Sequence, residues 1–143
     1  MKHSAMLLSA VLSLVGCASS GPTSSTEERL TLYRAHSTPV DSFRINKLDG
    51  PLSRWSRLGD QALVVWDASG DPYLLELPEP CSGLATTGSI GLTNSTGTVT
   101  PGTNSVQLRG GSRAGRAYFC KIGTARRIDM AAVDKARVSP SAH

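Results

Sequence analysis

The clearest pattern in the chain is a pair of apolar runs separated by turn-forming residues. The first run, Gln61–Trp66, is rich in aliphatic and β-branched residues, and the second is Tyr73–Leu77. The six residues between them include a glycine, a proline and two aspartates, which are typical of a chain reversal. The sequence therefore predicts a β-hairpin, with Tyr73, Leu75 and Leu77 on one face of its second strand.

Shorter alternating runs predict further strands on either side of this hairpin, at Ser42–Asn46 and at Arg116–Ile122. The residues expected to share a face are Phe43 with Ile45 in the first run, and Tyr118 with Cys120 and Ile122 in the second. Between them, Ser82–Ser105 is very rich in Gly, Ser and Thr. This segment fits either thin strands or a long mobile loop, and its persistent alternation favours strands.

Two segments have helical features. Asp129 precedes Met130–Arg137, in which Met130, Val133 and Arg137 fall on one face, so we expect a short capped helix with a narrow stripe that packs. Glu27–Ala35 fits either a helical turn or a strand. Repeated short strands with turn signals predict a mainly β fold, a small single-domain antiparallel barrel or sandwich with one core and a short C-terminal helix.

The first sixteen residues predict a lipoprotein signal peptide. After a basic start, the apolar run Ala5–Val15 has the length of a secretory h-region and is too short to span a bilayer. Leu14–Cys17 resembles the lipobox of bacterial lipoproteins, which implies cleavage before Cys17 and a diacylglyceryl group on its sulfur. Two acyl chains anchor a protein stably, whereas one is marginal. The alternative is an ordinary signal peptide with an incidental Cys17.

The predicted anchor divides the chain into three parts. Residues 1–16 are the signal peptide, residues 17–26 are the lipidated cysteine and a flexible Ser/Thr/Gly/Pro tether, and residues 27–143 are a single β-rich domain. The residue after the lipobox is Ala18, whereas an aspartate there resembles an inner-membrane retention signal. We therefore expect a protein anchored through Cys17 to the outer membrane and facing the periplasm.

Composition and cysteine count narrow the picture further. The 143 residues are 39% hydrophobic, 5% aromatic and 18% charged, as expected for one globular domain with an aliphatic core. Once Cys17 is lipidated, Cys81 and Cys120 remain in an oxidising compartment, which predicts a structural disulfide. Free buried thiols, or redox or metal chemistry, are the alternatives; there is no Cys-x-x-Cys motif and no nearby histidine.

The formal net charge of +4 is unevenly distributed. Residues 17–108 hold six basic and nine acidic groups, whereas residues 109–143 hold eight basic and two acidic ones. The basic C-terminal third fits contact with anionic lipid headgroups or with an envelope protein partner. A solvated face that the acidic part neutralises within the fold is the favoured interpretation. Arg109–Arg116 resembles an Arg-Gly-Gly nucleic-acid segment, but an exported protein rarely meets nucleic acid, so we expect no such partner.

No pattern predicts catalysis, a metal or a cofactor. Asp67, Ser69 and Asp71 resemble the start of a calcium loop, but the required bidentate glutamate would stand where Pro78 is, so a turn is favoured. His36 is expected to be a lone surface histidine. The chain has no Gly-x-Ser-x-Gly elbow, and paired carboxylates such as Asp60 and Asp67 have no geometry that spacing alone can assign. We therefore expect a protein that is not an enzyme.

Several short motifs follow one another in a distinctive order. They are the lipobox, Val40–Phe43, Trp55, Leu58–Asp60, Ala62–Val65, Tyr73–Leu77, Pro80–Cys81, Ser89–Leu92 and Cys120–Ile122 ahead of Asp129. This order resembles a family of small gammaproteobacterial lipoproteins built on a domain of unknown function, over about residues 30–130. The resemblance implies a β-rich, disulfide-bearing envelope lipoprotein and no particular activity.

Three functions remain at this stage. The preferred one is a non-enzymatic binding or structural module of the cell envelope. The second is a small barrel that binds an apolar or amphiphilic ligand, which requires an open interior lined by Leu, Val and Trp66. The third is a minor hydrolase, for which the sequence offers no residue set.

Overall fold

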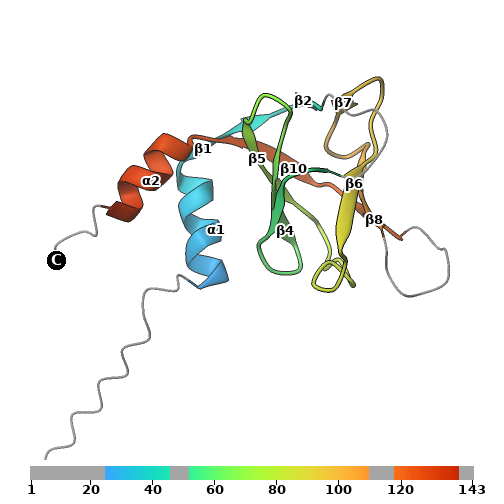
Figure 1. Cartoon of the computed structure of the whole chain (residues 1–143), viewed down its shortest axis with the longest axis horizontal. Coiled ribbons are helices and arrows are strands. Elements are labelled where there is room, and N and C mark those ends of the chain that lie inside the picture. The colour runs from blue at the N-terminus through green and yellow to red at the C-terminus, as the bar shows by residue number, and fades with distance from the viewer. Residues whose placement is uncertain (1–24, 46–51, 110–117, 139–143) are drawn as a thin grey trace, which may run out of the picture.

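A computed structural model describes residues 25–45, 52–109 and 118–138 of the chain (Figure 1). The elements in chain order are α1 (Thr26–Ala35), β1 (Ser37–Val40), β2 (Phe43–Arg44), β3 (Trp55–Arg57), β4 (Ala62–Trp66), β5 (Pro72–Glu76), β6 (Ser89–Leu92), β7 (Thr98–Val99), β8 (Ser105–Arg109), β9 (Tyr118–Lys121), β10 (Thr124–Ile128) and α2 (Met130–Val138). The expected mainly β fold with a short C-terminal helix is confirmed.

The predicted hairpin is β4–β5, and it lies inside a five-stranded antiparallel sheet of order β1-β10-β5-β4-β3. Leu63 pairs with Leu75 across the two strands. The turn between them is closed by the carboxylate of Asp67, whose Oδ1 accepts the N–H of Asp71 at 2.9 Å. Gly70 adopts φ +87° there, a conformation that favours glycine.

The five-stranded sheet is buried on both faces. Leu75 and Leu63 face a core shared with the other strands, whereas Leu74 and Val64 face a second cluster that includes Tyr33 and Val133 of the two helices. Figure 1 shows α1 and α2 on one side of the sheet and β6 and β8 on the other. Burial on both faces explains why β4 and β5 are continuously apolar rather than alternating. The expectation of a single core was wrong, because the helices enclose a second one.

The remaining strands form a second layer. A three-stranded antiparallel sheet has the order β6-β8-β9, and β2 pairs with β7 in a separate two-stranded ribbon. The strand interpretation of Ser82–Ser105 is therefore confirmed, with β6 and β7 inside that segment. The described strands belong to three separate sheets. Of the two predicted architectures, the sandwich agrees with this arrangement and the closed barrel does not.

The chain returns from the second layer to the first sheet at Gly123, which separates β9 from β10. Its N–H donates to the carbonyl of Glu76 at 2.8 Å, and a Cβ at this position would lie 3.2 Å from that same oxygen. A side chain at this position would press against the backbone of Glu76, so the close approach favours glycine. Gly123 therefore allows β10 to enter the sheet directly beside β5.

The sequence did not predict β1, β3 or β10. The strand β10 is internal to the sheet, between β1 and β5, yet it contains only two apolar residues, Ala125 and Ile128. These two residues face opposite clusters, Ala125 the second layer and Ile128 the helices. The alternation of apolar and polar residues that usually marks a strand is therefore absent from β10. Two consecutive arginines in the strand make it look still more polar.

Tyr118 shares a face of β9 with Cys120, as expected, but it is not buried with it. Cys120 and Ile122 are buried as expected, but Tyr118 is 52% exposed. Tyr118 lies at the start of β9, and β9 is an outer strand of its sheet. A residue at a sheet margin has fewer neighbours, so an apolar pattern does not guarantee its burial.

The helix boundaries follow from capping. Ser25 and Glu28 form a capping box: the Ser25 hydroxyl accepts the N–H of Glu28 at 3.2 Å, and the Glu28 carboxylate accepts the N–H of Ser25 at 3.1 Å. Glu27–Ala35 is thus helical, and Ser25 and Thr26, expected in the tether, begin the helix. Asp129 caps α2 as predicted, accepting the N–H of Ala132 at 3.1 Å. No helix in the described part of the chain has the length and apolar character to cross a bilayer.

A matched pair of substitutions in α2 tests the helix-side core. Val133 is 0% exposed and Val138 is 81% exposed. We expect Val133→Ala to lower the free energy of unfolding by about 2 kcal/mol, because it leaves a cavity under the helix. Val138→Ala, the control, should change it by less than about 0.5 kcal/mol. Urea denaturation measures both, and equal effects of the two variants would show that α2 is not docked.

Candidate functional site

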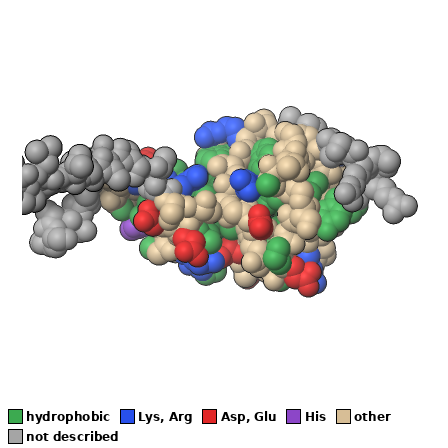
Figure 2. Space-filling view, turned by 90° about the horizontal axis from the view of Figure 1, so that it is seen from below, with side chains coloured by type: hydrophobic (Ala, Val, Ile, Leu, Met, Phe, Trp, Pro, Cys, Tyr) green, Lys and Arg blue, Asp and Glu red, His purple; other side chains and the backbone are tan. Residues whose placement is uncertain are grey.

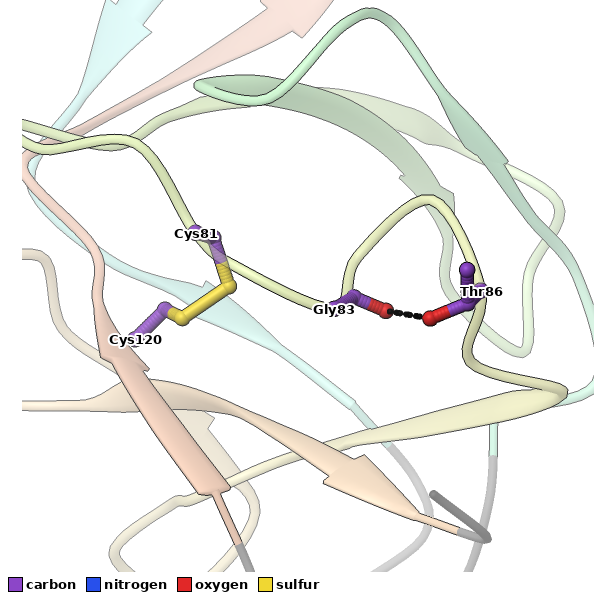
Figure 3. Close-up of a disulfide and its surroundings, with 4 residues drawn as sticks. All are labelled: Cys81, Gly83, Thr86 and Cys120. Atoms are coloured by element: carbon purple, nitrogen blue, oxygen red, sulfur yellow. Dashed lines mark hydrogen bonds between the residues drawn. A yellow bond between two sulfur atoms is a disulfide. The ribbon is translucent and has the colours of Figure 1, made fainter. Parts of the chain in front are cut away.

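The predicted disulfide is present and joins the two layers of the fold. Cys81 follows the end of β5, and Cys120 lies in β9 of the three-stranded sheet (Figure 3). Their Cα atoms are 5.8 Å apart, and 39 positions separate them in the sequence. The free-thiol alternative for this pair is therefore excluded.

The disulfide is buried and lies in a well hydrogen-bonded part of the chain, as expected for a bond with a structural role. Cys81 is 2% exposed and Cys120 is 9% exposed, and both belong to the larger core. The N–H of Cys81 donates to the carbonyl of Asp60 at 2.8 Å. Immediately beyond it, the Thr86 hydroxyl donates to the carbonyl of Gly83 at 3.3 Å and closes a turn (Figure 3). Burial and fixed geometry keep the sulfur atoms away from thiol exchange.

A groove of about 720 Å³ lies at the end of the five-stranded sheet nearest the β4–β5 turn. It is lined by Thr38, Val40, Gly70, Asp71, Pro72, Arg127, Ile128, Asp129 and Met130. Its charged centre is an ion pair in which Arg127 Nη2 lies 3.1 Å from Asp71 Oδ2. Because these two charges already neutralise each other, the pair holds the hairpin turn against β10 rather than offering a reactive group.

Tyr73 lies beside this ion pair, since it pairs with Arg127 across the sheet. Its ring stacks on that of Phe43, with 4.4 Å between the ring centroids. Burial raises the pKa of the Tyr73 hydroxyl, and the nearby carboxylates of Asp67 and Asp71 raise it further, whereas Arg127 lowers it. The phenol is thus held in its neutral form by its surroundings.

The other residues with candidate chemistry have structural roles. Asp67 and Asp71 form the predicted turn. Asp60 and Asp67 lie at opposite ends of β4, so they do not form a carboxylate pair. His36 is half-buried at the end of α1, where its carbonyl accepts the N–H of Asp129 at 2.8 Å. No group of three or more metal-ligating side chains occurs among residues 25–45, 52–109 and 118–138.

Three arginines of the basic C-terminal third have partners within the described residues. Arg126 Nε donates to the Ser37 hydroxyl at 2.8 Å, and Arg127 pairs with Asp71. Arg137 donates to the hydroxyl of Tyr33 at 3.0 Å and lies over its ring. These arginines tie β10 and α2 to the rest of the domain. Cys17 and residues 110–117 of the Arg-Gly-Gly segment lie outside the described residues.

Sequence reasoning missed Asn104, the buried polar side chain of the described residues, which is 8% exposed. Its Oδ1 accepts the N–H of Thr100 at 2.7 Å, and its Nδ2 donates to the Thr93 hydroxyl at 3.4 Å. Its carbonyl accepts the N–H of Ile122 at 3.1 Å. Asn104 thus joins the β7–β8 turn to the start of the β9–β10 connection. The Pro-Gly dipeptide just before it predicts a turn but not this network.

Comparison with known proteins gives one match. A family model described as "Family of unknown function (DUF6491)" matches residues 1–142. No curated protein and no solved structure gives a significant match to the chain.

We expect the protein with the disulfide to be much more stable than a variant without it. Closing a loop of this length contributes about 4 kcal/mol through the chain entropy of the unfolded state. Cys120→Ser should lower the free energy of unfolding by about that amount and expose Cys81 to thiol reagents. Urea denaturation with and without reductant measures this, and wild-type protein in reductant is the matched control. Equal stability of oxidised wild type and Cys120→Ser would contradict the assigned role.

The pKa of Tyr73 predicts a loss of stability at alkaline pH. The unfolded chain releases this proton near pH 10.0, whereas the folded protein releases it at higher pH. The stabilisation that neutral Tyr73 gives the folded protein is therefore fully present below the pKa of the unfolded chain. It is lost as the pH rises through the pKa of the folded protein. We expect wild type to lose stability more steeply than Tyr73→Phe between about pH 9 and about pH 11. Parallel pH profiles in urea denaturation would show that Tyr73 is not responsible.

Proposed function

The chain belongs to a family of unknown function, DUF6491, and we propose that this protein is a lipid-anchored component of the bacterial cell envelope. In this proposal it is a gammaproteobacterial lipoprotein attached through Cys17 to the outer membrane. The folded domain faces the periplasm and acts as a non-enzymatic binding or structural module.

The observation that carries the proposal is the buried disulfide between the two layers. Disulfides form and persist in the periplasm and outside the cell, whereas the cytosol keeps thiols reduced. Cys81 and Cys120 are the cysteines left once residue 17 is lipidated, and they pair with each other. The fold therefore uses its cysteines as an exported lipoprotein would.

The junction between tether and domain supports an anchor at this end. Ser25, Thr26, Glu27 and Glu28 are exposed, and the capping box gives α1 a defined start. The described part of the chain therefore begins at the surface of the domain. The signal-peptide pattern and Leu14–Cys17 supply the lipid attachment.

The packing favours a surface-binding module over a ligand-binding barrel. An open interior would need the aliphatic residues of the sheet and Trp66 to face one cavity. Instead, Leu63 and Val65 pack into the larger core, whereas Trp66 packs against the helix-side cluster and lies under Arg54, 4.6 Å from the ring centroid. The second candidate function has no observation in its favour.

Two substitutions at the predicted lipobox test the anchor. Cys17→Ala should leave an uncleaved or soluble product, because the acyl chains have no attachment atom. Ala18→Asp, which keeps Cys17, should shift the lipidated protein to the inner membrane. Fractionation of host membranes with immunodetection measures both. Unchanged outer-membrane recovery of Cys17→Ala would refute the anchor.

A further inference from the structure

The outer strand β9 displays the two exposed aromatic side chains of the described residues. Phe119 is 53% exposed and Tyr118 is 52% exposed, whereas Tyr33, Phe43 and Tyr73 are buried. Figure 2 shows hydrophobic surface at the right-hand end of the molecule, where the three-stranded sheet lies in Figure 1. An exposed aromatic ring is apolar surface that a docking partner can cover.

Register places basic groups on the same face as Phe119. Phe119 pairs with Gln107, and Lys121 pairs with Ser105. Alternation along β8 then puts Arg109 on this outer face as well, two residues beyond Gln107. Lys121 is exposed, and Arg109 is half-buried with its guanidinium 3.2 Å from the Gln107 side-chain oxygen. We call Arg109, Phe119 and Lys121 the β9 surface. Tyr118, one residue before Phe119, lies on the opposite face of the strand, which it shares with Cys120.

The three-stranded sheet that carries the β9 surface contains no acidic residue. From Pro80 to Ile128 the sequence contains no Asp or Glu and six Arg or Lys. The three-stranded sheet therefore supplies no carboxylate of its own that could neutralise Lys121 or Arg109. Arg126 and Arg127 of β10, by contrast, are engaged with Ser37 and Asp71. The charge of this layer is complementary to an anionic surface.

We propose that the β9 surface docks the domain onto the anionic headgroup layer of a phospholipid bilayer. Aromatic side chains favour the headgroup region of a membrane, and each Lys or Arg near an anionic bilayer adds electrostatic attraction. Phe119 enters the headgroup region and Lys121 contacts lipid phosphates, while Arg109, half-buried beside Gln107, adds positive charge next to them. The surface combines the two contributions that peripheral membrane attachment requires.

This inference rests on the proposed envelope location, because that location brings a bilayer within reach. A tether of residues 18–24 spans at most about 25 Å when fully extended. A domain held that close meets the bilayer at a high effective concentration, so a weak contact suffices. Docking would then turn a tethered domain into one with a fixed orientation on the membrane.

Labelling of two lysines tests the proposal in the full-length processed protein. The protein is mixed with vesicles of phosphatidylcholine containing phosphatidylglycerol, or of phosphatidylcholine alone, and treated with a water-soluble amine-acylating reagent. We expect the labelling rate of Lys121 to fall about fivefold with the anionic vesicles only. Lys135 is an exposed lysine on α2, at the opposite end of the domain, and it should be labelled equally in both.

Two further arms separate docking from other causes of protection. Salt at about 1 M, which shortens electrostatic screening to about 3 Å, should restore the labelling of Lys121. Phe119→Ala should also restore it, whereas Tyr118→Ala, on the other face of the strand, should not. Unchanged urea denaturation of both variants shows that they are folded. If the labelling rate of Lys121, like that of Lys135, is the same with anionic and with neutral vesicles, the proposal is overturned.

Protection of Lys121 in intact envelopes but in neither vesicle would also overturn the lipid assignment, and would indicate a protein partner instead. The mass of the Cys17 peptide from the same sample reports the anchor independently. A lipidated Cys17 with unprotected Lys121 would refute the β9 surface alone, whereas an unmodified Cys17 with protected Lys121 would refute the anchor alone.

Discussion

The bond between Cys81 and Cys120 ties together two layers that differ greatly in their capacity to order themselves. The five-stranded sheet buries apolar side chains on both faces, whereas the second layer consists of short strands rich in Gly, Ser and Thr. Ordering such a chain has a high entropic cost and gains little burial in return. The disulfide holds the start of this layer to its last strand, and Asn104 and Gly123 fix its return to the sheet. The exposure of β9 depends on that arrangement.

The hairpin, the C-terminal helix and the thin strands could be predicted because each has a local signal: an apolar run, a capping aspartate or a persistent alternation. The strand β10 could not, because Ala125 and Ile128 face different clusters and no single face carries its pattern. The two-core arrangement was hidden for the same reason. Continuous apolar runs in β4 and β5 were the available sign that something covers both faces of the sheet. The Ser-x-x-Glu sequence at Ser25 and Glu28 is also a local signal, since it indicates the start of the helix α1.

The candidate site, too, has features that the sequence predicts and features that it does not. The disulfide followed from counting cysteines, because lipidation of one leaves an even pair. Asn104, the groove around Asp71 and Arg127, and the β9 surface all depend on contacts between residues far apart in the sequence, which no local pattern reports. Charge counting indicated the C-terminal third, yet three of its arginines are engaged with Ser37, Asp71 and Tyr33 of the same domain. Within that third, the structure moves attention to β9 and the end of β8, and both the proposed anchor and the proposed docking surface then concern the same membrane.

The central claim is that one cysteine carries lipid while the other two bind each other. Mass spectrometry of the protein isolated from its host membranes, with free thiols alkylated before digestion, tests both halves together. The account predicts a peptide beginning at Cys17 that carries acyl chains, and a cross-linked pair of peptides joining Cys81 to Cys120. Alkylated Cys81 and Cys120, or a Cys17 bearing only the alkylating group, would contradict it.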